Sequence, residues 1–378
     1  MVTFGFLSTY PPTRCGIASF TAALRAALPR RAAGGVVRLV DSPPGTRPAG
    51  VVGELVTDSA DGCRAAAALL NRNDVAIVQH EYGIYGGADG DHVLRVLAGL
   101  SVPAVVVVHT VLTEPTAHQR AVLGEVLAAA TAVVTMSQTA RRRLITGYAT
   151  SADRVHVIPH GAPESPAALP APRGNRRPRR RQQILTWGLL GPGKGIEWGI
   201  EAVALLDDLA PAPRYVVAGR THPKVLAQQG ERYRDFLASR AHNLGVGDRL
   251  RFHSGYLDTA SLHGLLADAD VVLLPYDSRE QVTSGVLIEA VTSRTPVVAT
   301  RFPHAVELLA DGAGVLVDHQ DPVSIAAAIR LVLTDSAAAG EMAAAAELAA
   351  RSLGWTCVAR EYCRLAAGLV RVPAPVVA

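Results

Sequence analysis

The chain has 378 residues, of which 49% are hydrophobic and 19% charged, a composition typical of a globular protein with more than one core. No apolar run reaches the ~18 residues of a membrane-spanning helix, and residues 1–7 lack the basic segment typical of a signal peptide. The four cysteines lack the paired spacing of a zinc site, so we expect free thiols and a cytoplasmic location.

The formal net charge of +4 comes from one short segment. Six arginines fall between residues 173 and 181, and removing them from the 37 basic residues leaves 31 against 33 acidic ones, a net charge of −2. This distribution argues against a nucleic-acid-binding surface. We expect the segment to be a solvated linker, with contact to an anionic membrane surface as the alternative.

In the first part of the chain, short apolar runs alternate with helical patterns. Strands are predicted at residues 2–7, 36–40, 75–79, 104–108, 132–135 and 155–158, and helices at 17–28, 92–100, 117–130 and 138–148. Continuous apolar strands that alternate with helices are typical of a parallel, doubly wound sheet.

The same alternation restarts after the arginine-rich segment. Strands are predicted at residues 184–187, 214–218, 250–252, 271–275, 296–299 and 314–317, and helices at 195–207, 228–244, 260–267, 286–292, 306–310, 322–334, 337–353 and 355–369. The fold class is therefore α/β, with a first domain over 1–165, a linker over 166–182, a second domain over 183–354 and a last helix within 355–378. Two doubly wound domains would face each other across a cleft at the carboxyl ends of their strands, where ligands bind.

The stretch 276–300 is predicted to be a loop that passes into a helix and then a buried strand. Gly285 begins the helix, where unpaired N–H groups form an anion site and a glycine lets a ligand approach the backbone. Glu289 lies one turn further on, where a carboxylate can accept hydrogen bonds from a ribose. An ordinary solvated glutamate is the alternative.

A glycine-rich loop, WGLLGPGKG at residues 187–195, follows another predicted strand. Gly188 to Lys194 matches G-x-x-x-x-G-K, but Gly195 stands where a P-loop has the Ser or Thr that binds Mg²⁺, which argues against an ATPase. Lys194 is one of only two lysines in the chain. We expect it to bind a diphosphate without a metal and Arg220, at the next strand end, to reach the same anion. Ordinary turn chemistry for Lys194 and a surface salt bridge for Arg220 are the alternatives.

Polar residues also follow two strands of the first domain. His109 ends the strand over 104–108 and is expected to bond a sugar hydroxyl, with a buried structural role as the alternative. The strand end at His80, Glu81 and Tyr82 is expected to face the same cleft. No Ser-His-Asp set, HExxH motif or paired-cysteine metal site is present in the sequence.

Together these motifs resemble those of the retaining GT-B glycosyltransferases of family 4, closest to the mannosyltransferase-like branch. The resemblance covers nearly the whole length and rests on TYPPTRCGIASFT (9–21), QHEYGIYGG (79–87), VVHT (107–110), VIPHGAP (157–163), GLLGPGKGIE (188–197), AGRTHP (218–223), PYDSREQVTSGVLIEAV (275–291) and AVELL (305–309).

The resemblance implies a GT-B fold whose C-terminal helix crosses back onto the first domain. It implies a metal-independent, retaining hexosyltransferase that uses a nucleotide-diphosphate sugar, GDP-mannose or a UDP-sugar, with mannose favoured. The second domain would hold the donor and the first a hydroxyl acceptor, which is a glycan, a lipid-linked molecule or a small molecule. The implied catalytic residues are His109, Lys194, Arg220 and Glu289. The implied donor-binding residues are Gly16, Gly188, Gly193, Lys194, Arg220, Tyr256, Leu257, Gln281, Ser284, Gly285, Val286, Leu287 and Glu289. The acceptor-side candidates are His80, Glu81, Tyr82 and Arg14.

The chain departs from the family pattern at two positions. Gln281 replaces the first glutamate of the E-x₇-E motif that ends at Glu289, and Leu189 stands where relatives often have a basic residue. Arg220 is expected to supply that missing charge. A nucleotide-sugar-binding sensor without catalysis remains the alternative function. A further alternative is peripheral binding at the inner face of the membrane through residues 141–143 and the linker.

Overall fold

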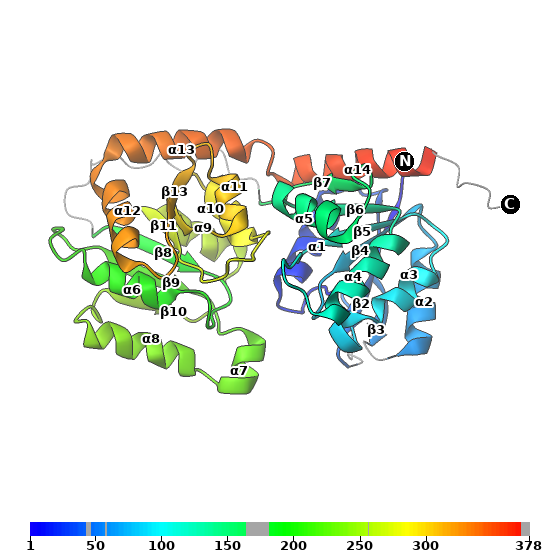
Figure 1. Cartoon of the computed structure of the whole chain (residues 1–378), viewed down its shortest axis with the longest axis horizontal. Helices are drawn as coiled ribbons and strands as arrows, with labels where there is room; N and C mark the ends of the chain where they lie inside the picture. Colours follow the sequence, from blue (N-terminus) through cyan, green and yellow to red (C-terminus); the bar gives the residue numbers. More distant parts are fainter. Residues whose placement is uncertain (43–46, 57–58, 164–180, 256, 372–378) are drawn as a thin grey trace. The chain divides into compact units, whose positions relative to one another are not determined.

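The computed structural model describes residues 1–42, 47–56, 59–163, 181–255 and 257–371. The chain forms two compact units, one of Met1–Gly161 with Ser352–Ala378 and the other of Ala162–Arg351. Most of the linker predicted over 166–182 lies outside the described residues. The two units, unit 1 and unit 2, are each built on one sheet (Figure 1).

Unit 1 contains a seven-stranded parallel sheet in the order β3-β2-β1-β4-β5-β6-β7. Its strands are β1 Phe4–Ser8, β2 Ala33–Val40, β3 Val51–Val56, β4 Val75–His80, β5 Ala104–Val108, β6 Ala132–Thr135 and β7 Val155–Val157. Its helices are α1 Gly16–Ala27, α2 Ala60–Leu70, the 3₁₀ turn η1 Ala88–Gly90, α3 Val93–Ala98, α4 Ala117–Ala129, α5 Gln138–Tyr148 and α14 Trp355–Arg371. The order reverses at β1, as in doubly wound folds.

The sequence prediction missed β3 and α2. Gly53 and Glu54 interrupt the apolar run of β3, so the segment lacks the continuous pattern of the other strands. The structure accommodates Glu54 because its carboxylate pairs with the buried Arg38 of β2 at 2.6 Å, and the two residues lie opposite each other in register. A buried charge is tolerated in this way only when it is paired.

The last helix belongs to the core of unit 1. Val358, Ala359, Tyr362 and Ala366 of α14 are buried at helical spacing and pack in the same cluster as Phe20 of α1. The predicted return of the C-terminal helix to the first domain is therefore confirmed.

Unit 2 contains a six-stranded parallel sheet in the order β10-β9-β8-β11-β12-β13. Its strands are β8 Gln183–Trp187, β9 Arg214–Ala218, β10 Leu250–His253, β11 Val271–Leu274, β12 Val297–Thr300 and β13 Gly314–Val317. Its helices are α6 Ile196–Ala204, α7 Pro223–Gln229, α8 Arg232–Asn243, α9 Thr259–Asp268, α10 Gly285–Thr292, α11 Pro303–Leu308, α12 Pro322–Thr334 and α13 Ser336–Ala350.

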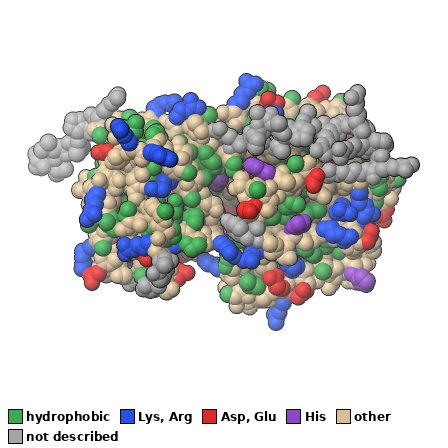
Figure 2. All heavy atoms as spheres, turned by 180° about the vertical axis from the view of Figure 1, so that it is seen from behind, with side chains coloured by type: hydrophobic (Ala, Val, Ile, Leu, Met, Phe, Trp, Pro, Cys, Tyr) green, Lys and Arg blue, Asp and Glu red, His purple; other side chains and the backbone are tan. Residues whose placement is uncertain are grey.

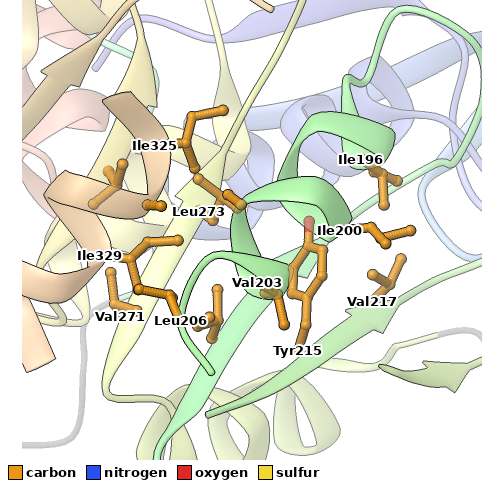
Figure 3. Close-up of a cluster of buried hydrophobic side chains, with 14 of the residues drawn as sticks. Ile196, Ile200, Val203, Leu206, Tyr215, Val217, Val271, Leu273, Ile325 and Ile329 are labelled. Atoms are coloured by element: carbon orange, nitrogen blue, oxygen red, sulfur yellow. The ribbon is translucent and has the colours of Figure 1, made fainter. Parts of the chain in front are cut away.

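The core of unit 2 forms where α6 and α12 pack on the sheet. Ile196, Ile200 and Val203 project from one face of α6 toward the strand side chains, and Ile325 and Ile329 project from α12 (Figure 3). The spacing of four and three residues in α6, and of four residues in α12, places these side chains on one apolar stripe of each helix. This packing fixes the start of α6, and with it the end of the glycine-rich loop that precedes it.

Two helix predictions in unit 2 were wrong in their bounds. The single helix predicted over 228–244 is the pair α7 and α8, because Gly230 adopts φ = 62° and ends α7. The helix predicted over 306–310 begins earlier, at Pro303, because proline is favoured at the first helical position.

Among the described helices, no single one is long and apolar enough to cross a membrane, and α12 and α13 pass such a test only as a pair bent by 95°. On the face that Figure 2 shows, basic, acidic and hydrophobic side chains are interspersed. The basic side chains of the described residues are therefore not gathered into one surface on that face.

Candidate functional site

In unit 2, the loops that follow β8 and β9 are joined by backbone hydrogen bonds. The N–H of Gly188 donates to the carbonyl of Ala218 at 3.0 Å, and the N–H of Leu190 donates to the carbonyl of Arg220 at 2.7 Å. A Cβ atom at Gly219 would lie 2.0 Å from the carbonyl oxygen of Gly188, so only glycine permits this approach. The two loops therefore act as one rigid support at the carboxyl edge of the sheet.

The loop after β8 is also locked against the loop after β11. Gly195 caps α6 with φ = 62°, and a Cβ atom there would lie 1.8 Å from the carbonyl oxygen of Pro275. The N–H of Asp277 donates to the carbonyl of Gly193 at 3.0 Å. Both contacts flank Lys194, so the backbone on either side of this lysine is fixed.

Lys194 is a partly buried cation without an acidic partner among the described residues. Its Nζ atom lies 4.2 Å from the centroid of the Tyr276 ring, and burial lowers the pKa of the ammonium group. A desolvated ammonium without a counter-ion favours the arrival of an anion. The predicted role in diphosphate binding fits this environment.

The start of α10 provides backbone donors beside the glycine-rich loop. Ser284 is the N-cap residue, and its hydroxyl accepts the N–H of Leu287 at 3.2 Å. The N–H groups of Gly285 and Val286 have no partner in the part of the chain that the structure describes. A Cβ atom at Gly188 would lie 3.6 Å from the Val286 side chain, so the two elements are close. The N–H of Leu287 is occupied by Ser284, which leaves the first two N–H groups for an anion.

Glu289 projects from the second turn of α10 and is also poorly solvated. Its Oε2 atom accepts a hydrogen bond from the indole N–H of Trp187 at 3.2 Å, and burial raises the pKa of the carboxyl group. The site thus holds a partly buried acid and a partly buried base that form no ion pair with each other.

The remaining predicted donor residues are placed differently. The side chain of Arg220 is exposed and pairs with no acid among the described residues, so it is available to an anion. Gln281 is committed to its own loop, because its Nε2 atom donates to the carbonyl of Thr283 at 3.0 Å. Leu257 is partly buried, and Tyr256 lies outside the described residues.

Two predicted residues of unit 1 lie at the start of α1. Gly16 is its first residue, is exposed, and has nothing within 4 Å of a Cβ position, so a ligand can approach its backbone. The N-cap is Cys15, whose Sγ atom accepts the N–H of Ala18 at 3.4 Å. The neighbouring Arg14 is exposed. All four cysteines are free, as predicted.

His109 lies in an enclosed aromatic environment of unit 1. Its Nε2 atom is 2.6 Å from Gln79 Oε1, and its ring meets that of Phe20 edge to face with centroids 5.2 Å apart. Burial, together with the nearby His160 and His80, lowers the pKa of His109 to about 3. The imidazole is therefore neutral at pH 7 and can form hydrogen bonds without carrying a charge.

The acceptor-side candidates of unit 1 follow β4. His80 is buried, its pKa is lowered to about 4 by desolvation, and its ring packs against that of Tyr82 with centroids 5.3 Å apart. Glu81 accepts a hydrogen bond from the hydroxyl of Thr110, which follows β5. The structure thus brings the ends of β4 and β5 together, as the sequence predicted for a parallel sheet.

Sequence reasoning assigned no role to several residues that shape the site in unit 2. Trp187 contacts Glu289 and Tyr276 contacts Lys194, and burial, with the charges of Lys224 and Lys194, lowers the pKa of His222. Arg234 of α8 donates to the carbonyl of Gly219 at 2.9 Å and lies 5.1 Å from the Phe252 ring centroid. The position of the two aromatic residues at strand ends was a usable signal, whereas the contact of α8 with the loop after β9 required the fold.

The described residues include no group of three or more His, Cys, Asp or Glu side chains placed to hold a metal ion. The groups available for an anionic ligand in unit 2 include the ammonium of Lys194, the guanidinium of Arg220 and the N–H groups at the start of α10.

Structural comparison identifies the fold. The Anabaena protein HepE in complex with UDP is similar with a TM-score of 0.76 and 17% identity, covering 97% of this chain and 100% of that one. Sucrose-phosphate synthase from Thermosynechococcus elongatus is similar with a TM-score of 0.74 and 17% identity, covering 98% of this chain and 99% of that one. Two parallel-sheet α/β units with these neighbours confirm the predicted GT-B fold.

Curated relatives are more similar in sequence but are matched only in part. The D-inositol 3-phosphate glycosyltransferase of Xylanimonas cellulosilytica is 30% identical over 250 residues, which are 63% of this chain and 57% of the relative. That of Geodermatophilus obscurus is 30% identical over 72% of this chain and 63% of the relative. A glycogen synthase of Mycobacterium tuberculosis is 32% identical over 46% of this chain and 40% of the relative. The chain spans about half of the length of the curated relatives that it matches.

Two family models cover most of the chain in succession. Residues 17–165 match the model described as Glycosyltransferase Family 4, and residues 171–351 match the model described as Glycosyl transferases group 1. The chain therefore belongs to the group 1, family 4 glycosyltransferases of the GT-B fold.

Proposed function

We propose that this protein is a hexosyltransferase that moves a sugar, with retention of anomeric configuration, from a nucleoside diphosphate to a hydroxyl acceptor. The observation that carries the proposal is the pair of unneutralised charges in unit 2. The ammonium of Lys194 lies over the Tyr276 ring, and the carboxylate of Glu289 accepts the indole N–H of Trp187. Neither contact neutralises the charge, so both charges stay available to a ligand. A nucleotide-linked sugar has complementary groups, since its diphosphate is anionic and its ribose donates hydrogen bonds.

The proposed reaction requires charge stabilisation on the leaving group. The bond between the sugar C1 atom and the β-phosphate oxygen breaks, and its electron pair remains on the phosphate. Lys194, Arg220 and the free N–H groups of Gly285 and Val286 stabilise that negative charge. The acceptor hydroxyl attacks C1 from the same face and passes its proton to the departing phosphate. The neutral His109 positions a sugar hydroxyl by hydrogen bonding.

The donor is a hexose nucleotide. Mannose is the preference drawn from the sequence motifs, whereas similarity to HepE, whose structure contains UDP, supports a UDP-sugar. We propose, as the family resemblance implies, that transfer proceeds without a divalent metal. Gln281 would contribute hydrogen bonds without charge.

The proposed site of action is the cytoplasm. Contact with an anionic membrane was predicted through residues 141–143 and the linker. Arg141 and Arg143 donate to backbone carbonyls, and most of the linker lies outside the described residues. Co-sedimentation with vesicles that contain anionic lipid tests whether a lipid-linked acceptor belongs to the proposal.

A donor panel tests the proposed function. Binding of GDP-, UDP- and ADP-hexoses is measured by isothermal calorimetry with and without EDTA, and release of the nucleoside diphosphate is measured with hydroxyl acceptors. We expect one base class to bind and turn over in the presence of EDTA, and NMR of the product to show the anomeric configuration of the donor. Binding without turnover would favour a sensing protein, and no binding by any donor would contradict the proposal.

A further inference from the structure

Tyr276 and Lys194 form a cation–π pair at the centre of the site in unit 2. The Nζ atom lies 4.2 Å from the ring centroid, and the tyrosine side chain is only 1% exposed. The ring is itself fixed, because it stacks on Phe302 with centroids 5.2 Å apart and an interplanar angle of 27°. The face that meets the ammonium is therefore a rigid surface rather than a mobile side chain.

The ring takes the place that a carboxylate usually has beside a partly buried lysine. The Tyr276 ring faces the ammonium, and the pKa of His222 is lowered by burial first and then by the charges of Lys224 and Lys194. Glu289, the acid that α10 brings to the site, bonds the Trp187 indole instead. No other acid that the structure describes pairs with the ammonium.

An aromatic ring and a carboxylate differ in what they do to an incoming anion. A ring face attracts a cation through its quadrupole but carries no net charge, so the ammonium keeps its full charge toward a phosphate. A carboxylate in the same place would repel a diphosphate and would have to be displaced before binding. A ring therefore holds the lysine without competing with the ligand.

We propose that Tyr276 is a positioning residue that holds the Lys194 ammonium, charged and oriented, until the donor diphosphate binds. This inference rests on the proposed function for the identity of the ligand. It requires the ring rather than the phenol hydroxyl, so phenylalanine can replace tyrosine and an aliphatic residue cannot.

The composition of the chain allows a direct test. Lys194 and Lys224 are its only lysines, so reductive methylation with ¹³C-formaldehyde yields two dimethyl-lysine NMR signals besides that of the terminal amine. Lys224 is exposed on α7 and serves as the internal reference. The variants are Tyr276→Phe, Tyr276→Leu and Phe302→Leu. Phe302→Leu removes the stacking partner of the Tyr276 ring but keeps the ring itself. It therefore loses about as much packing as Tyr276→Leu without losing the contact between ring and lysine.

The expected signals distinguish positioning from a purely structural role. In the wild type, in Tyr276→Phe and in Phe302→Leu, the Lys194 methyl signal lies upfield of the Lys224 signal because of the ring current. Tyr276→Leu abolishes this upfield shift. Because the ring favours the charged form, Tyr276→Leu also lowers the pH at which Lys194 titrates. An unchanged shift and midpoint in Tyr276→Leu would overturn the inference.

Ligand affinity completes the test with the nucleoside diphosphate that the donor panel selects. We expect Tyr276→Leu to weaken its binding about ten-fold and Tyr276→Phe to restore wild-type affinity within about two-fold. Equal losses in Tyr276→Leu and Phe302→Leu would mean that packing alone is responsible and would overturn the inference. If the wild type binds no nucleoside diphosphate while the Lys194 signal behaves as expected, the proposed function fails and the contact between ring and lysine stands.

Discussion

The indole N–H of Trp187 donates to the carboxylate of Glu289 at 3.2 Å, which joins the last residue of β8 to the second turn of α10. This hydrogen bond favours the charged form of Glu289, while burial disfavours it, and burial has the larger effect on the pKa. The carboxylate is therefore held in place at a cost to the stability of unit 2. Such a cost is expected where a charge is kept for a ligand.

Glu289→Gln is expected to stabilise the fold and to weaken donor binding. Glutamine keeps an oxygen that accepts the Trp187 N–H and removes the buried charge. Because the folded-state pKa of Glu289 lies above its unfolded value, the native state binds more protons in that interval, and stability falls as pH rises through it. The variant should lose this pH dependence and melt at a higher temperature at pH 7. The loss of a charged hydrogen-bond acceptor for the ribose should lower the affinity for the nucleotide-sugar donor about ten-fold or more.

Thermal unfolding at pH 5 and pH 8, with calorimetric titration of the donor, measures both effects. A variant that melts at a lower temperature than the wild type would contradict the stability cost of burying the Glu289 charge. Unchanged affinity for the donor would contradict the role of Glu289 toward the ribose.

Trp187→Phe is expected to destabilise the protein, because it removes the indole N–H that donates a hydrogen bond to Glu289. The desolvated carboxylate would then lack its hydrogen bond, which costs about 1–3 kcal/mol. Trp198→Phe is the matched control, because its indole N–H also donates to a partly buried carboxylate, that of Asp277 at 2.9 Å, whereas burial raises the pKa of Glu289. Urea unfolding should show the larger loss for Trp187→Phe at pH 8. At low pH, where Glu289 is protonated, the difference in stability between the two variants should shrink. A difference that stays the same at low pH would mean that lost packing, and not the lost hydrogen bond, causes it.

Much of the fold followed from local patterns in the sequence. The strands of both sheets other than β3 were visible as short apolar runs, because a strand covered on both faces leaves no polar positions. The edge strand β3 escaped because Gly53 and Glu54 break its pattern, and Glu54 is explained only by Arg38, which lies on another strand. Pairing between distant residues is not a local property of the chain.

The site was predictable to the extent that glycines and strand ends mark it. Lys194 and Glu289 were found because one follows a glycine-rich loop and the other lies a turn beyond Gly285. The contacts that hold them were not found, because Trp187 and Tyr276 read as ordinary apolar residues until the sheet order placed β8 beside β11. The role of each predicted residue toward a ligand stays a prediction.

Gly195→Ala is expected to impair the site far more than Gly193→Ala. Both glycines have positive φ, so alanine strains either backbone by about 1 kcal/mol or more. At Gly195 the new Cβ would also lie 1.8 Å from the carbonyl oxygen of Pro275, whereas nothing lies within 4 Å at Gly193. Gly195→Ala should therefore displace the loop that carries Lys194 and weaken nucleotide binding at least ten-fold. Calorimetry and urea unfolding of the two variants provide the comparison, and equal losses would refute the packing argument.

Arg234→Met is expected to weaken donor binding through the loop that carries Arg220. The guanidinium donates to the carbonyl of Gly219, and the neighbouring Glu231 accepts the hydroxyl of Thr221, so α8 holds the loop on both sides of Arg220. Methionine keeps the packing volume but loses the hydrogen bond, and we expect the affinity for the nucleotide to fall about three- to ten-fold. Arg240→Met, on the same helix but paired with Glu201, is the control and should bind normally. A similar loss in both variants would indicate a general effect on α8.

Acid is expected to destabilise unit 1 through three enclosed histidines. The pKa values of His80, His109 and His160 are lowered to about 4, 3 and 4, mainly by burial. Below their ordinary pKa of about 6.5 the unfolded chain binds protons that the native state does not, so stability falls as pH drops from about 6.5 toward 4. Each such proton contributes about 1.4 kcal/mol per pH unit.

His160→Phe separates this effect from general instability. Phenylalanine keeps a ring against Phe20 and Trp355, whose centroids lie 5.0 and 5.6 Å from that of His160, but it cannot bind a proton. Urea unfolding at several pH values between 4 and 7 gives the free energy of unfolding as a function of pH. Its slope in the variant should correspond to about one proton fewer than in the wild type. His242→Asn, at an exposed position on α8, is the control for the loss of a histidine outside this enclosed group. If His160→Phe kept the full slope, another group would have to account for the acid sensitivity. The conclusion that His160 is neutral in the folded protein would then be contradicted.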